Sequence, residues 1–162
     1  MISKQVYKVL NDQMNFEDES ARLYRALGIH AEVMELNGFG CFFNKRADEE
    51  MDHYGWIRDY IDEQGEHPIL NSLPKPPSSW DNPLKMLMDS LAHEKKVTSN
   101  LKNIMNLAKA ENDYQTEELM YRMLKEQVEE EDMYNKLIAR YLMFADGDMA
   151  GLQEFDESIG EI

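Results

Sequence analysis

The chain has 162 residues, a length typical of one domain, and 43% of them are hydrophobic, enough to form a sizeable core. Its 32 acidic residues outnumber its 17 basic ones and give a formal charge of −15. This excess argues against nucleic acid and anionic membranes as partners and favours cations, although simple solubility explains the charge equally well. The single Cys41 rules out an intrachain disulfide.

The expected compartment is the cytoplasm. A lone cysteine fits a reducing environment. The N-terminus has no apolar signal region. No stretch approaches the roughly 18 apolar residues that a membrane-spanning helix needs.

All five prolines fall within residues 65–83, together with glycine, serine and asparagine. Because proline disrupts helix interiors, this window predicts one long connection, and the rest of the chain is free to form long helices. Two helical patterns precede the connection and two follow it. They span about Ser3 to Glu35, about Phe39 to Gln64, Asn82 to about Ala110, and from the Asn112-Asp113 break to about Phe144.

A short amphipathic segment, 149–159, follows the fourth pattern and places Leu152, Phe155 and Ile159 on one side. The predicted fold class is therefore all-α. We expect a single domain over residues 1–162, a four-helix bundle with a long crossover between the second and third helices and a short fifth helix at the C-terminus. The crossover makes the helices on either side of it parallel.

Apolar residues repeat every seven positions along each long helix, as bundle packing requires. One acidic residue interrupts each stripe about halfway along the helix: Glu17, Glu50, Glu94 and Glu130. A buried, unpaired carboxylate is costly. The only basic residue of the stripes at this level is Arg46, which cannot neutralise four carboxylates. Two divalent cations would balance them, and carboxylates with an imidazole suit iron or manganese.

The imidazole comes from His53, one turn after Glu50. This Glu-x-x-His spacing puts both side chains on one helical face, as in di-iron bundles. The pair alone is a weak signal, but three further acids in register make it strong. The alternative is an ordinary acidic bundle with partly exposed glutamates.

The first helix carries LNDQMNFE at 10–17 and then Tyr24, the second carries DEEMDH at 48–53, the third carries Glu94, and the fourth carries EQVEEE at 126–131. With these motifs the chain resembles the bacterial non-haem ferritins over almost its whole length. The resemblance implies that Glu17, Glu50 and His53 hold a first iron. Glu50 would bridge to a second iron, completed by Glu94 and Glu130.

The resemblance also assigns supporting roles. Gln127 would orient ligands, and Tyr24 would hydrogen-bond near the centre and is a candidate electron donor. Glu49, Glu126 and Glu129, together with Glu130, resemble a third iron site facing the cavity, and a solvated charge run explains these three equally well. Arg122 stands where some relatives carry an aromatic residue, which bears on electron transfer. His30, His67 and His93 are expected to be surface groups.

The implied function is ferroxidase and iron storage: oxidation of Fe(II) with O2 and deposition of Fe(III) mineral inside a homo-oligomeric cage of twenty-four subunits. Haem is not expected, because Gln127-x-x-Glu130 stands where bacterioferritins have a second Glu-x-x-His, although Met51 falls where they place a haem methionine. Two alternatives stay open. One is a storage subunit without ferroxidase activity, and the other is a different di-iron or di-manganese oxidoreductase such as a rubrerythrin-like peroxidase.

Overall fold

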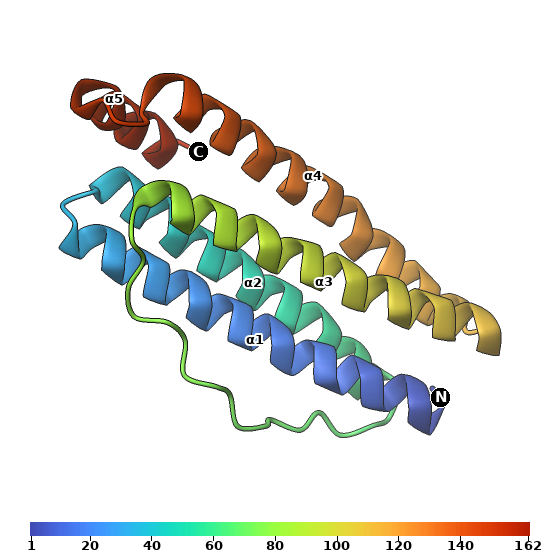
Figure 1. Ribbon diagram of the computed structural model, residues 1–162. Helices are drawn as coiled ribbons and strands as arrows, with labels where there is room; N and C mark the ends of the chain where they lie inside the picture. Colours follow the sequence, from blue (N-terminus) through green and yellow to red (C-terminus); the bar gives the residue numbers. More distant parts are fainter.

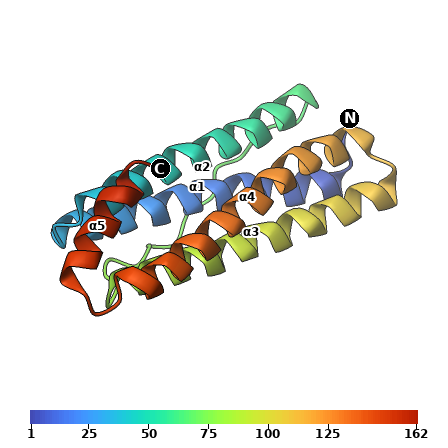
Figure 2. The same ribbon diagram turned by 90° about the horizontal axis from the view of Figure 1, so that it is seen from above.

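The computed structural model describes all 162 residues and contains helices only. Four long helices form a bundle, and a short fifth helix closes one end of it (Figures 1 and 2). None of the helices has the length and hydropathy needed to cross a membrane. The helices are α1 (Lys4–Val33), α2 (Asn37–Glu63), α3 (Pro83–Glu111), α4 (Tyr114–Phe144) and α5 (Met149–Gly160).

The crossover, residues 64–82, runs along the bundle and returns the chain to the end where α2 began, so α2 and α3 are parallel (Figure 1). Side chains of α1 hold the crossover through its backbone. Asn11 exchanges two hydrogen bonds with the backbone of Ile69, and Asn15 accepts one from the amide of Asn71 at 2.8 Å. The ring of His30 lies beside the backbone of the buried Trp80, with Nε2 3.2 Å from the amide nitrogen. His30 is therefore an anchor of the crossover, and its prediction as a surface group was wrong.

Capping residues define the helix ends much as their types predict. Asn82 Oδ1 accepts a hydrogen bond from the Lys85 amide, and Pro83 occupies the first turn of α3. Gly65 follows α2 with a φ of 78°, the left-handed cap that glycine allows. Residues 37–38, which fall between the first two predicted helical spans, lie instead inside the first turn of α2. The turn between α1 and α2 uses Glu35, at a φ of 61°.

That early start of α2 depends on α5. Asp156 accepts hydrogen bonds from the amides of Gly38 and Phe39, at 3.1 and 2.8 Å, and so caps the N-terminus of α2. The approach is so close that a Cβ on Gly38 would lie 1.7 Å from the Asp156 carbonyl oxygen. Phe155 packs between Phe39 and the side chain of Tyr141. The fifth helix thus buries part of its apolar side within its own subunit.

The apolar core has two parts. One cluster of 17 buried residues occupies the α5 end of the bundle, and another of 12 occupies the opposite end. Between them the bundle buries polar and charged side chains from all four long helices, including Glu17, Glu50, Glu94 and Gln127. This polar layer lies where the acidic residues interrupt the apolar stripes.

Candidate metal centre

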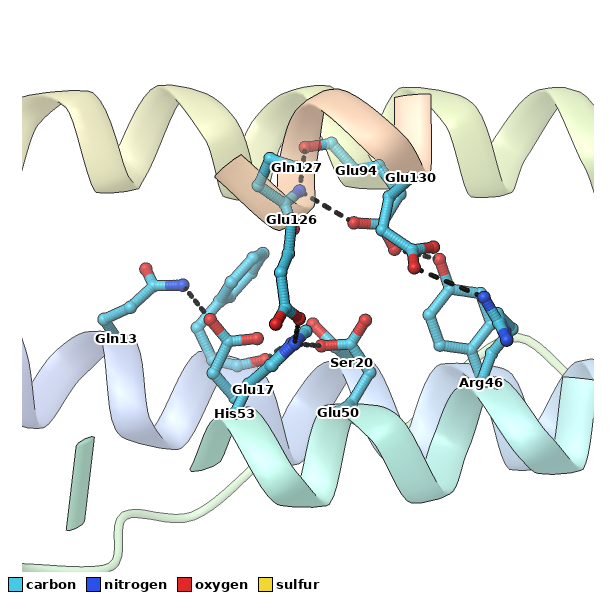
Figure 3. A network of polar contacts seen from close by, with 12 residues as sticks. Gln13, Glu17, Ser20, Arg46, Glu50, His53, Glu94, Glu126, Gln127 and Glu130 are labelled. Atoms are coloured by element: carbon cyan, nitrogen blue, oxygen red, sulfur yellow. Dashed lines mark hydrogen bonds and ion pairs between the residues drawn. The ribbon is translucent and has the colours of Figure 1, made fainter. Parts of the chain in front are cut away.

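The polar layer brings together the residues that the sequence singled out. Glu17 comes from α1, Glu50 and His53 from α2, Glu94 from α3, and Gln127 and Glu130 from α4 (Figure 3). All are buried except Glu130, whose side chain is 17% exposed. The heptad spacing of each helix explains this burial, since each residue occupies a position that otherwise belongs to the core stripe.

Glu17, Glu50 and His53 each present one ligand atom, and these atoms lie within 4.8 Å of one another. His53 Nδ1 is 3.2 Å from Glu50 Oε2. Gln13 Nε2 donates a hydrogen bond to Glu17 Oε1 at 2.7 Å. The second oxygen, Glu17 Oε2, is buried and has no hydrogen-bond partner. A buried acceptor without a donor is costly, and a cation would satisfy it.

The carboxyl groups of this layer resist ionisation. Burial raises the pKa of Glu17 well above its ordinary value, and the charge of Glu50 raises it further. Burial and then the charge of Glu94 raise the pKa of Glu50 in the same way. Burial also raises the pKa of Glu94, although hydrogen bonds from Tyr24 and Gln127 oppose the change. Without a cation the layer therefore retains protons at a pH where exposed glutamates are ionised.

Two neighbours position Glu94. The hydroxyl of Tyr24 donates a hydrogen bond to Glu94 Oε1. Gln127 Nε2 donates to Glu94 Oε2 at 2.9 Å and to the backbone carbonyl of the same residue at 3.2 Å. Tyr24 and Gln127 thus reach one carboxylate from opposite helices and fix its orientation.

Tyr134 belongs to this layer and was not predicted to. It is fully buried, its hydroxyl has no hydrogen-bond partner, and burial together with the charge of Glu94 raises its pKa well above the ordinary value. Its ring packs edge-on against Phe42. The sequence feature that could have indicated this is the position of Tyr134 one heptad after Gln127 in the core stripe of α4. A tyrosine buried there brings a hydroxyl group that normally requires a hydrogen-bond partner.

Glu130 faces away from the cluster of Glu17, Glu50 and His53. Its Oε1 pairs with Arg46 Nη1 at 3.2 Å (Figure 3). Arg46 Nη2 pairs with Glu49 Oε1 at 2.7 Å. Burial raises the pKa of Glu130 to about 7, with the Arg46 charge acting in the opposite direction. The pairing of Arg46 with both carboxylates was not anticipated from the sequence.

The three residues of the suggested outer site are not gathered into one cluster. Glu126 Oε2 lies 2.7 Å from His53 Nε2, and Glu49 is held by Arg46. Glu129 is exposed. Glu126 therefore contacts a buried residue of the centre, Glu49 is tied to Arg46, and Glu129 is exposed.

Two aromatic contacts flank the layer. The Arg122 guanidinium lies over the Trp56 ring, 3.5 Å from its centroid, and the Trp56 ring is 5.1 Å from that of His53. An aromatic side chain is thus present beside the centre, supplied by α2. On the other flank, His93 lies 2.7 Å from Ser20 Oγ and stacks on Phe16. Its prediction as a surface group was wrong, whereas His67 is exposed.

Comparison with known proteins agrees with this geometry. The model of the ferritin-like domain family matches residues 7–143. The chain belongs to the ferritin family. This ferritin chain is 37% identical to the bacterial non-heme ferritin of Staphylococcus epidermidis over 134 residues, which are 83% of this chain and 81% of the relative. It is 33% identical to that of Staphylococcus aureus over 160 residues, 99% of this chain and 96% of the relative.

Solved ferritin structures also have the same fold as this ferritin chain. An open pore ferritin from the archaeon Archaeoglobus fulgidus superposes with a TM-score of 0.96 at 28% identity, covering 99% of this chain and 98% of that one. A closed form engineered from the same archaeal ferritin superposes with a TM-score of 0.95 at 29% identity, with 99% and 97% coverage. The predicted resemblance and the predicted four-helix fold with a fifth helix are confirmed.

Proposed function

We propose that the chain is an iron-storage ferritin subunit that oxidises Fe(II) with O2 at the buried carboxylate layer. The observation that carries this proposal is the set of four carboxylates and one imidazole inside the bundle, with a buried Glu17 oxygen that lacks a partner. Oxygen donors with one nitrogen donor are a ligand set suited to Fe(II). Two dications would balance the charges of Glu17, Glu50, Glu94 and Glu130.

The positions of the side chains support the proposed ligand roles. Glu17, Glu50 and His53 already converge within 4.8 Å and would take the first Fe(II). Glu94 and Glu130, which come from the facing helices, would complete a second position, with Glu50 between the two. Gln127 and Tyr24 hold the Glu94 carboxylate in place through their hydrogen bonds.

The reaction assigned to the site needs electron transfer and proton release. Each bound Fe(II) gives one electron to O2, and the two ions in one site deliver electrons as a pair. Carboxyl groups that hold protons in the metal-free protein release them when a cation binds, because the positive charge favours their ionised form. The two apolar clusters on either side of the layer limit access of bulk water.

An outer site would pass iron between the centre and a storage cavity. Glu49 and Glu126 lie next to the buried ligands in sequence or in space and are partly exposed, and Glu129 is exposed. Exposed carboxylates lose little hydration and bind a cation weakly, so ions there would exchange more easily than ions in the centre. This proposal makes the outer residues modulators of the reaction.

Storage requires a cage, which we propose to contain twenty-four subunits in the cytoplasm. Leu142, Met143 and Phe144 are consecutive and more than half exposed at the corner between α4 and α5. Contiguous apolar surface of this kind is typical of a subunit interface. The charge of −15 per chain favours cation attraction to such an assembly.

Stopped-flow oxidation of Fe(II) tests the proposal. Glu50→Ala removes the carboxylate shared by the two positions and should lose most of the fast oxidation phase, by about a hundredfold or more, at two Fe(II) per subunit. Glu63→Ala, an exposed acid on the same helix, is the control and should react as the wild type does. Unchanged fast kinetics in the Glu50 variant, or no fast phase in the wild type, would reject ferroxidase activity at this site.

A further inference from the structure

Arg46 is a buried cation next to the carboxylate layer. It lies one turn before Glu50 on α2, and its side chain is 8% exposed. Nη2 pairs with Glu49 and Nη1 with Glu130, while Nε has no partner. The guanidinium also lies over the Phe42 ring, with 5.3 Å between Cζ and the ring centroid. Since arginine remains charged at any physiological pH, this position carries a permanent positive charge.

The Glu130 carboxylate is paired with Arg46, 3.2 Å from Nη1. Ligand atoms of Glu17, Glu50 and His53 lie within 4.8 Å of one another, and Glu130 is not among this group. Its carboxylate is directed at Arg46 instead (Figure 3). A partly buried carboxylate and a buried guanidinium stabilise each other, and separating them leaves a buried charge without its partner.

We propose that Arg46 is a positioning residue that competes with the second metal ion for Glu130. The proposal rests on the proposed two-metal centre and adds a reason why its two positions differ. The first position is formed by ligands that already converge. The second requires Glu130 to leave Arg46, so the free energy of that ion pair is subtracted from the affinity of the second ion.

The same arginine links the centre to the outer residues. Arg46 holds Glu130 with one nitrogen and Glu49 with another. When an ion takes Glu130, the guanidinium keeps Glu49 as its remaining carboxylate partner. A cation bound at Glu49 would remove that partner and so disfavour the departure of Glu130. Occupancy of the second position and of Glu49 should therefore oppose each other, and the coupling must act equally in both directions.

Calorimetric titration of the assembled, metal-free protein with Zn(II) tests the competition, because Zn(II) binds without redox chemistry. Arg46→Gln removes the charge and should tighten the second Zn(II) by about tenfold or more, the range for one hydrogen bond between charged groups, with the first unchanged. Arg46→Lys keeps a charge without the planar fork and should fall between that variant and the wild type. Arg58→Gln is the control, since Arg58 is an exposed arginine of α2 paired with Asp59.

The outcomes separate this inference from the function on which it rests. An unchanged or weaker second Zn(II) in Arg46→Gln overturns the competition while leaving the two-metal centre intact. A wild type that binds fewer than two Zn(II) per subunit rejects the centre itself. Crystals of the Zn(II)-loaded wild type give a second readout that needs no variant. Glu130 should have left Arg46 while Glu49 remains paired with it, and a Glu130–Arg46 bond that persists with both metal positions filled would overturn the proposal.

Discussion

At the scale of single residues, the buried carboxyl groups of the bundle centre oppose folding when they are ionised without a cation. Glu17 has a buried oxygen without a partner. Burial raises the pKa values of Glu17 and Glu50 well above their ordinary values, and it also raises the pKa of Glu94. Such groups are tolerated only when they hold protons or a cation. The burial of carboxyl groups at the centre therefore offsets part of the stabilisation that the apolar clusters contribute.

This arrangement predicts an unusual pH dependence of the metal-free protein. Glu130 has an ordinary pKa of 4.5 and a folded pKa of about 7, so its stabilising proton is lost as pH rises through that interval. The raised pKa values of Glu17, Glu50 and Glu94 act in the same direction. The melting temperature of the metal-free protein should fall between about pH 5 and about pH 8, and saturating Zn(II) at the higher pH should restore it.

A variant with Glu17, Glu50 and Glu94 all changed to Gln is the comparison. His93, whose folded pKa of about 4 lies below its ordinary 6.5, destabilises the fold as pH falls, in the opposite sense, but it is present in both proteins. Glu130 is also present in both proteins, so the difference between the two melting curves isolates the contribution of Glu17, Glu50 and Glu94. Parallel curves at every pH, or no shift with Zn(II) in the wild type, would contradict the account.

The sequence predicted the buried acids but not how they pair. Their burial followed from heptad positions, which fix the face of a helix on which a residue lies. The partnership of Arg46 with Glu130 depends on the relative rotation of α2 and α4 and on side-chain rotamers, which a periodic pattern does not specify. The same holds for Tyr134 near Glu94 and for Arg122 over Trp56, both contacts between different helices.

At the scale of helices, long-range contacts set the ends that local signals misplaced. Asn82 with Pro83 and Gly65 marked helix ends correctly because their effect is local. Residues 37–38 looked like a break but lie in the first turn of α2, where Asp156, more than a hundred residues away, accepts hydrogen bonds from the amides of Gly38 and Phe39. The ties between Asn11, Asn15 and the crossover are likewise long-range, and no pattern in the sequence indicates them.

Two glycines of α2 make this point testable. A Cβ at Gly38 would lie 1.7 Å from the Asp156 carbonyl oxygen, so Gly38→Ala must push α5 away and should destabilise the protein by about 1–3 kcal/mol. A Cβ at Gly55 meets nothing within 4 Å, so Gly55→Ala should stabilise by about 0.5–1 kcal/mol through helix propensity. Melting temperatures of the two variants, measured at one metal loading, compare them. Equal shifts would mean that α5 does not dock as described.

At the scale of the whole molecule, a single bundle leaves large apolar side chains exposed, which we propose are covered by other copies in the cage. Leu142, Met143, Phe144 and Met149 surround the corner between α4 and α5, with exposures from 52% to 88%. Light scattering should give a mass about twenty-four times the 19.0 kDa of one chain. Phe144→Glu places a charge in this apolar surface and should shift the distribution toward smaller species. A mass near that of one chain in the wild type would reject the cage.

The central claim is that the carboxylate layer of each bundle is a two-metal site for iron. A crystal of the assembled protein soaked anaerobically with Fe(II), with anomalous data collected at the iron edge, examines that claim most directly. Two iron peaks per subunit are expected. One should be bound by Glu17, Glu50 and His53, and the other by Glu50, Glu94 and Glu130. A centre without iron peaks, in crystals whose outer acidic residues do bind iron, would contradict it.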